Sequence, residues 1–320
     1  MTVPDVADLV DRARRYEPRA VARLISLVED ASPQLREVAA ALAPLTGRAQ
    51  VIGLTGPPGV GKSTSTSALV TSLRAQGKRV GVLAVDPSSP FSGGALLGDR
   101  IRMQQHATDP GVFIRSMATR GHLGGLSWAT PQALRVLDAA GFDVVLVETV
   151  GVGQSEVDVV SLADTTIVLL APGMGDGIQA AKAGILEIAD VFVVNKADRD
   201  GAEATVRDLK NMVAMSRRGV AGSSWRQPIV PTVASTMDGV DDVVKAIETH
   251  HQWLVEHDEL GQRRYRRARA EVEAIALESV RAKLGGPGED ALRRLSERVS
   301  AGEIDPYTAA DRLVEGISGG

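Results

Sequence analysis

The chain has 320 residues, 44% of them hydrophobic, which is enough for one α/β domain with additions or for two average domains. Its formal net charge of −4 argues against a nucleic-acid-binding protein, because such proteins are usually basic. It has no cysteine, which excludes disulfides and thiolate metal sites. No apolar stretch reaches the roughly 18 residues of a membrane span, and the first residues lack an apolar signal core, so we expect a soluble cytoplasmic protein.

Residues 1–48 predict an N-terminal helical extension. Apolar residues recur there at the three- and four-residue spacing of a helix face in two runs. The runs are Val21, Leu24, Ile25 and Val28, and then Leu35, Val38, Ala39 and Leu42. Between them, Ser32 and Pro33 predict a helix cap followed by a first-turn proline.

Residues 49–256 alternate short apolar strands with helices. The predicted strands are Val51–Thr55, Val80–Val85, Val112–Ser116, Val144–Glu148, Thr166–Leu170, Val191–Val194 and Ile229–Val233. Strands that are apolar on both faces are typical of a parallel sheet covered by helices. We therefore predict an α/β fold with a doubly wound, mostly parallel sheet, whose ligands bind at the carboxyl ends of the strands.

Residues 257–320 predict a C-terminal helical segment. Tyr265, Ala268, Val272, Ala276 and Val280 recur at helical spacing, and the glycines at 285 and 286 with the proline at 287 end that helix. Two shorter helices are predicted over Glu289–Val299 and Pro306–Leu313. Helices attached to an α/β core either pack on it or associate with a second copy of the chain.

The phosphate-loop pattern G-x-x-x-x-G-K-[ST] occurs once, between a predicted strand and a predicted helix. It comprises Gly56, Pro57, Pro58, Gly59, Val60, Gly61, Lys62 and Ser63, and Thr64 follows it. Glycine lets several backbone N–H groups come close to phosphate oxygens, and the N-terminal end of the helix adds positive potential. We expect Lys62 to contact the β- and γ-phosphates and Ser63 to offer its hydroxyl to Mg²⁺. The pattern predicts a P-loop NTPase.

The pattern N-K-x-D selects a guanine nucleotide among the possible ligands. It is formed by Asn195, Lys196 and Asp198, directly after a predicted strand. The Asp198 carboxylate can accept hydrogen bonds from N1–H and the exocyclic amine of guanine, and adenine has no donors at those positions. Asn195 would tie this loop to the phosphate loop, and the stem of Lys196 would cover the base. A backbone N–H at Ala234 or Ser235 is a further candidate contact, to the guanine oxygen.

Three acids are candidates for the metal and γ-phosphate side of the site. Glu148 ends a predicted strand, and with Gly151 it looks like the D-x-x-G switch of GTPases with Glu in place of Asp. We expect the Gly151 N–H to contact the γ-phosphate, and Glu148 either to reach Mg²⁺ through water or to orient the attacking water. Asp86 either supports Mg²⁺ without binding it directly or caps a turn. Asp99 lies in a glycine-rich stretch that suits a mobile first switch, and its catalytic role is open.

The group that orients the attacking water is less clearly marked. Ras-like enzymes place glutamine directly after the switch glycine, where this chain has Val152 and, two residues later, Gln154. Gln154 either orients the water or lies on a helix surface. We therefore expect slow intrinsic hydrolysis that a partner accelerates. The candidate catalytic residues are Lys62, Asp99, Glu148 and Gln154.

Together these motifs resemble the MeaB/ArgK family of P-loop GTPases, the methylmalonyl-CoA mutase-associated GTPases. The matching stretches are residues 53–64, 85–90, 97–103, 148–156, 175–184, 195–198 and 305–310. The resemblance covers nearly the whole chain, including both helical flanks. It implies a G domain that binds GTP or GDP with Mg²⁺.

The resemblance also implies a partner. Members of the family are homodimeric GTPases that act as chaperones for an adenosylcobalamin-dependent methylmalonyl-CoA mutase, gate the loading of its cofactor and protect it from inactivation. Dimerisation through the C-terminal segment is implied in the same way. So is a third switch around Gln179 and Lys182 that relays the nucleotide state to the mutase. No nucleic-acid or membrane partner is expected.

Two other functions remain as alternatives. A GTPase metallochaperone would carry segments rich in His or Cys, whereas this chain has five His and no Cys. The one adjacent pair, His250 and His251, is expected on a helix surface. A transport-associated kinase or ATPase would prefer ATP, which the aspartate of the N-K-x-D pattern disfavours.

Overall fold

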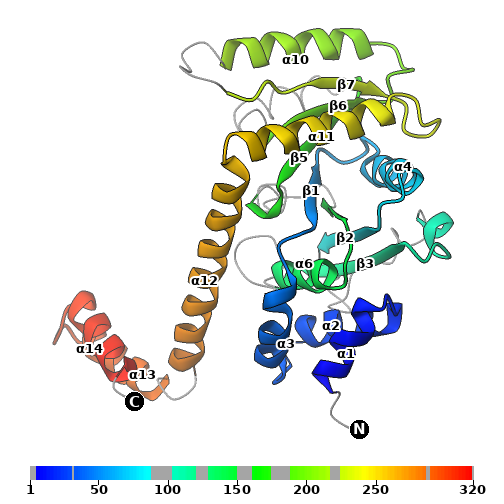
Figure 1. Ribbon diagram of the computed structural model, residues 1–320. Helices are drawn as coiled ribbons and strands as arrows, with labels where there is room; N and C mark the ends of the chain where they lie inside the picture. The colour runs from blue at the N-terminus through cyan, green and yellow to red at the C-terminus, as the bar shows by residue number, and fades with distance from the viewer. Residues whose placement is uncertain are drawn as a thin grey trace. The chain divides into compact units, whose positions relative to one another are not determined.

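The computed structural model describes residues 5–30, 32–87, 103–119, 129–149, 161–173, 188–216, 224–285 and 289–318 (Figure 1). The chain forms two compact units, Met1–Gly261 and Gln262–Gly320. No helix among the described residues is long and apolar enough to cross a membrane.

The first unit is built on a seven-stranded sheet in which all neighbouring strands run parallel. Its strands are β1 (Gln50–Thr55), β2 (Val80–Pro87), β3 (Val112–Thr119), β4 (Val144–Thr149), β5 (Thr165–Leu170), β6 (Val191–Asn195) and β7 (Ile229–Thr232). Their order is β3-β2-β4-β1-β5-β6-β7. All seven predicted strands are present with shifted ends, and the prediction of a doubly wound parallel sheet is confirmed.

Side chains alternate between the two faces of the sheet, and each face has its own helices. Ile52 and Leu54 of β1 share a buried cluster with α4 (Lys62–Ala75) and α11 (Val240–Glu256). On the other face, Val145 and Val147 of β4 meet α6 (Ala129–Ala139), and Phe192 of β6 meets α10 (Ala202–Ser216). Central strands buried on both faces therefore read as continuous apolar runs.

The N-terminal segment forms three helices that pack over α6. They are α1 (Val6–Arg14), α2 (Pro18–Glu29) and α3 (Leu35–Leu42), followed by the short η1 (Ala43–Leu45). Leu24 and Ile25 of α2 are fully buried in the cluster that includes α6. The Ser32 hydroxyl accepts the backbone N–H of Gln34 at 3.3 Å, as expected of a cap. The regular helix α3 begins only at Leu35, after a tight turn in which the Leu35 N–H donates to the Ser32 carbonyl at 2.8 Å.

An ion pair attaches α4 to the loop between the short η2 (Gln104–His106) and β3. The Arg74 guanidinium donates to both carboxylate oxygens of Asp109, at 2.8 and 2.9 Å. These bonds, together with the Gly111 N–H, hold the pKa of the Asp109 carboxyl below its ordinary value.

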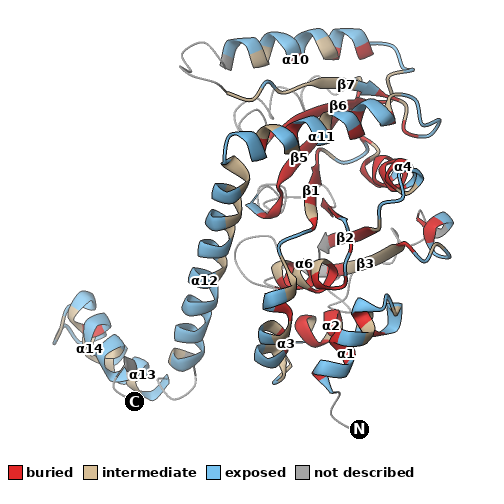
Figure 2. Cartoon of the chain, in the orientation of Figure 1, coloured by how far each residue is buried: buried red, intermediate tan, exposed pale blue. Residues whose placement is uncertain are grey.

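The second unit consists of helices, as predicted. They are α12 (Glu259–Gly285), which begins in the first unit, α13 (Glu289–Ser300) and α14 (Pro306–Ser318). α13 and α14 pack against each other. Asp305 caps α14 by accepting hydrogen bonds from the backbone N–H groups of Tyr307 and Thr308, at 2.9 and 3.0 Å. Most of this unit is exposed (Figure 2).

Candidate functional site

The phosphate loop connects β1 to α4 at the carboxyl edge of the sheet. Gly56 and Gly61 have φ angles of 144° and 94°, which side chains other than hydrogen rarely allow. A Cβ at Gly56 would overlap the carbonyl oxygen of Leu169, and one at Gly61 would overlap the Asn195 amide. Glycine is therefore required at both positions by the neighbouring strands β5 and β6, and not only by a ligand.

The first turn of α4 offers positive potential to this loop. Gly61 is the N-cap residue, and the helix has neither a side-chain cap nor an acidic residue in its first turn. Lys62 is largely buried, and its ammonium donates to the carbonyl oxygens of Gly56 and Pro57 at 2.5 and 3.1 Å. The lysine charge and the helix N-terminus thus converge on the loop, an arrangement that favours an anion.

Ser63 and Glu148 meet beside the loop. Because β4 pairs with β1, with Leu54 opposite Glu148, the strand end carrying this acid lies next to the phosphate loop. The Ser63 hydroxyl donates to the Glu148 carboxylate at 2.6 Å, and Glu148 is 1% exposed. The sequence-predicted metal candidates Ser63 and Glu148 are thus brought together as adjacent oxygen groups.

Asn195 links the phosphate loop to two strand ends. Its amide nitrogen donates to the carbonyl oxygen of Val60 at 2.8 Å. Its amide oxygen accepts from the Thr232 hydroxyl at 3.3 Å and from the Ala234 N–H at 3.1 Å. Because β6 pairs with β7, with Asn195 opposite Thr232, the sheet register brings these groups to one point. The sequence did not predict that the Thr232 hydroxyl contacts Asn195, because a threonine at the end of a strand belongs to no recognisable motif.

Lys196 adds a second link to the phosphate loop. The backbone of Lys196 has a φ angle of 60°, in the left-handed region, and the side-chain ammonium donates to the carbonyl oxygen of Gly59 at 2.6 Å. Asp198, two residues later, is exposed, so its carboxylate is open to a ligand at this end of the site. Asn195 and Lys196 therefore tie the N-K-x-D loop to the phosphate loop, and these two adjoining loops are called the nucleotide rim below.

The two candidate contacts to the guanine oxygen differ in their environment. Ala234 is buried, and its N–H already donates to Asn195, so Ala234 positions that side chain. Ser235 is exposed, and its N–H has no partner among the described residues. Ser235 is the better placed of the two to contact a ligand.

The remaining predicted residues lie on the rim, on β2 or outside the described ranges. Thr64 and Pro58 are exposed on the rim, and Pro57 is half-buried. Asp86 lies near the end of β2, one position beyond Val85, which pairs with Thr149. The predicted residues that lie outside the described ranges are Asp99, Gly151, Gln154, Gln179 and Lys182.

The prediction that the His250–His251 pair lies on a helix surface is wrong for His250. This residue of α11 is 0% exposed. Its Nδ1 lies 2.9 Å from the Thr165 hydroxyl and its Nε2 lies 3.3 Å from a carboxylate oxygen of Asp190. The Trp225 ring lies 4.8 Å from the His250 ring. A polar network at the start of β5 and β6 thus explains the burial, which helical periodicity alone did not reveal.

Comparison with known proteins finds matches along most of the chain. A family described as methylmalonyl Co-A mutase-associated GTPase MeaB matches residues 21–287. A putative GTPase of Pyrococcus abyssi is 47% identical over 320 residues, 98% of each chain. The mitochondrial methylmalonic aciduria type A homolog of Mus musculus is 33% identical over 92% of this chain and 75% of its own. A crystal structure of an LAO/AO transport system kinase superposes with a TM-score of 0.72, at 27% identity, over 99% of this chain and 100% of its own.

Proposed function

Because the chain belongs to the family of methylmalonyl-CoA mutase-associated GTPases, we propose that it binds GTP at the rim described above and hydrolyses it to GDP and phosphate. The observation that carries the proposal is the double role of Asn195. One side chain holds the phosphate loop at Val60 and the base-side loop at Ala234. The two halves of a guanine nucleotide site are therefore positioned by the same residue.

Selection of guanine is assigned to Asp198. Its exposed carboxylate accepts the two donors on the Watson–Crick edge of guanine, while adenine would leave it unpaired. Lys196, held across the loop by its bond to the Gly59 carbonyl, places its aliphatic stem where it can cover the face of the base. The Ser235 N–H is the proposed donor to the guanine oxygen.

The donor set beside the phosphate loop fits Mg²⁺. Hydroxyl and carboxylate oxygens are the ligands that this cation prefers, and it usually takes only one or two protein groups together with phosphates and water. Ser63 and Glu148, 2.6 Å apart, would hold it, and Asp86 would support it from the next strand. When bound, Mg²⁺ neutralises charge on the phosphates. Lys62 would move from its loop carbonyls to the phosphate oxygens.

The partner is the finer part of the proposal. We propose that GTP binding and hydrolysis gate cofactor loading to an adenosylcobalamin-dependent methylmalonyl-CoA mutase and protect that enzyme. The family match over residues 21–287 and the methylmalonic aciduria type A homolog support this assignment. Gln179 and Lys182 are the proposed relay. We further propose a homodimer formed through residues 262–320, whose helices expose apolar side chains.

The alternatives find less support. Among the described residues there is no group of three or more His, Cys, Asp or Glu that is arranged to hold a metal ion, so no observation favours a metallochaperone. The kinase named in the superposed crystal structure shares the fold, but Asp198 favours guanine over adenine and so disfavours an ATP-dependent activity.

The experiment is a GTP hydrolysis assay with and without a methylmalonyl-CoA mutase. We expect slow turnover alone and faster turnover with the mutase, and loss of the stimulation in Lys182→Ala. Lys62→Ala should weaken GDP binding at least about a hundredfold, because it removes charge-assisted bonds to the phosphates. Fast turnover of the isolated protein, at many per second, would reject partner-dependent activation. Unchanged nucleotide affinity in Lys62→Ala would reject the site itself.

A further inference from the structure

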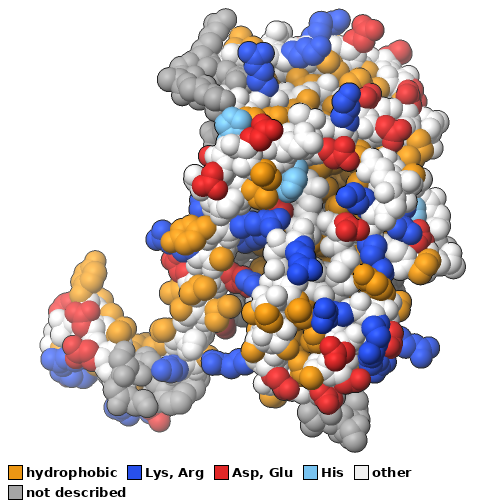
Figure 3. Space-filling model, viewed as in Figure 1, with side chains coloured by type: hydrophobic (Ala, Val, Ile, Leu, Met, Phe, Trp, Pro, Cys, Tyr) orange, Lys and Arg blue, Asp and Glu red, His pale blue; other side chains and the backbone are white. Residues whose placement is uncertain are grey.

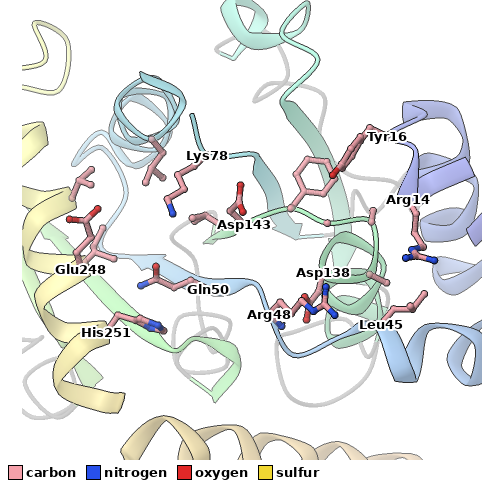
Figure 4. A pocket seen from close by; sticks show the side chains of 18 of the residues that line it. Arg14, Tyr16, Leu45, Arg48, Gln50, Lys78, Asp138, Asp143, Glu248 and His251 are labelled. Carbon is pink, nitrogen blue, oxygen red and sulfur yellow. Dashed lines mark hydrogen bonds between the residues drawn. The ribbon is translucent and has the colours of Figure 1, made fainter. Parts of the chain in front are cut away.

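A cavity lies at the opposite edge of the sheet from the phosphate loop. Its volume is about 660 Å³, a size suited to a small organic ligand (Figure 4). Its wall includes Gln50 at the start of β1, Asp143 just before β4 and Lys78 just after α4. These are the amino ends of strands, whereas the nucleotide rim is at the carboxyl ends. The cavity lies wholly within the first unit and shares no residue with the nucleotide rim.

Three cationic side chains line this cavity without an ion-pair or hydrogen-bond partner among the described residues. They are Arg14, Arg48 and Lys78, and all three are exposed to the cavity or to solvent. Figure 4 shows Arg14 and Arg48 near one end of the cavity and Lys78 near the other. The positive groups thus lie on two sides of the cavity.

Two of the three carboxylates in the wall, Asp138 and Asp143, accept hydrogen bonds from the backbone, and the third, Glu248 of α11, is exposed. Asp138 accepts the N–H groups of Gly47, Arg48 and Ala49, at 2.5, 3.1 and 2.9 Å. Asp143 accepts the N–H of Arg79 at 2.7 Å. These bonds fix the loops before β1 and β2. Within the described ranges, neither of these two carboxylates forms an ion pair with Arg14, Arg48 or Lys78.

Gln50 provides a buried donor at the centre of the site. Figure 4 shows its side chain between Glu248 and His251 of α11 on one side and Asp143 on the other. Its Nε2 is shielded from solvent and has no hydrogen-bond partner in the part of the chain that the structure describes. An unsatisfied buried N–H group costs free energy, so such a group in a wide polar cavity is suited to a ligand's acceptor.

We propose that this cavity binds a small organic anion whose phosphate or carboxylate groups are recognised by Arg14, Arg48 and Lys78. Gln50 donates a hydrogen bond to the ligand, and Glu248 accepts one from its hydroxyl or amino groups. The site is distinct from the nucleotide rim, and both can be occupied in the same chain.

The test is calorimetry on the full-length protein saturated with GDP and Mg²⁺, so that the nucleotide rim is filled. The two probes are adenosine 3′,5′-bisphosphate, which carries phosphates, and citrate, which carries carboxylates. At physiological salt we expect one of them to bind once per chain with a Kd below about 1 mM. The probe that binds identifies the anionic group.

Three variants separate a built site from general charge attraction. The double variant Arg48→Ala with Lys78→Ala should weaken binding at least about tenfold, because it removes two charge-assisted contacts. Lys210→Ala, which removes an exposed charge on α10, should leave binding unchanged. Gln50→Leu should weaken binding while the thermal midpoint of the ligand-free protein stays equal or rises, because the unsatisfied donor is lost.

Three results would overturn the proposal. The first is that neither probe saturates the protein. The second is that Lys210→Ala weakens binding as much as the double variant. The third is that Gln50→Leu lowers the thermal midpoint and leaves binding unchanged, since Gln50 would then act only in the fold.

Discussion

In residues 1–261 the apolar faces of strands and helices meet one another, whereas in residues 262–320 many apolar side chains face solvent. The exposed side chains of the second unit include Tyr265 at 68%, Val272 at 67% and Tyr307 at 84%. Apolar side chains gather on the surface of α12 and α14 (Figure 3). The first unit therefore has a closed core of its own, and the second has the composition of an interface.

The largest expected effect comes from removing the second unit. Deletion of residues 262–320 should convert a dimer into monomers that still bind GDP, because the deletion leaves the sheet and the nucleotide rim intact. Size-exclusion chromatography with light scattering measures the mass, and fluorescence titration measures the GDP affinity. A dimer that survives the deletion would refute the assignment of the interface.

A pair of truncations compares the two units directly. Leu24→Ala removes a fully buried side chain of α2 and should lower the free energy of unfolding by about 3 kcal/mol. Ile275→Ala on α12, where the side chain is 54% exposed, should change the stability of the monomer by less than about 0.5 kcal/mol but weaken the dimer. Chemical denaturation at low and high protein concentration measures both. If Leu24→Ala and Ile275→Ala lowered the free energy of unfolding of the monomer equally, the difference between the two units would be contradicted.

A smaller effect is expected from acid titration of an ion pair in the first unit. Arg74, and secondly the Gly111 N–H, lower the pKa of Asp109 below 3.8 in the folded protein. The resulting stability is present above the unfolded pKa, near 4, and is lost as the pH falls through the lower folded pKa. Asp109→Asn should therefore cost about 1 kcal/mol at pH 7, and the difference from the parent should vanish in acid. Urea denaturation across this pH range measures the difference.

The matched control lies in the second unit. Asp290 lies near Arg293 on α13 at 3.5 Å, and their side chains are 77% and 67% exposed. Asp290→Asn should leave stability within about 0.5 kcal/mol at every pH, because solvent screens so exposed a pair. A pH dependence as large as that of Asp109→Asn would show that burial does not set the strength of these pairs.

The fold was predictable because its signals are local. Apolar runs such as Val144–Leu146 mark strands buried on both faces, and the phosphate-loop pattern fixes the β1–α4 connection. The observed strand ends and the start of α3 differ from the predicted ones by a few residues. Backbone hydrogen bonds decide these boundaries, as the bond from the Leu35 N–H to the Ser32 carbonyl does before α3.

The candidate site was only partly predictable. The sequence identified Asn195, but not that it bonds Thr232 and Ala234, because those contacts depend on the register between β6 and β7. The burial of His250 and the cavity around Gln50 were likewise missed. Both depend on side chains from distant segments that meet at the amino edge of the sheet, and no short pattern records such a meeting.

The most direct test of the central claim, that the rim selects guanine, is calorimetry with GDP, ADP and xanthosine diphosphate on the parent and on Asp198→Asn. The account predicts that the parent prefers GDP over ADP by at least about a hundredfold, because adenine leaves the carboxylate unpaired. In Asp198→Asn the preference should move toward xanthosine diphosphate, whose C2 carbonyl accepts from the new amide. Equal affinity of the parent for ADP and GDP, or an unchanged preference in the variant, would contradict it.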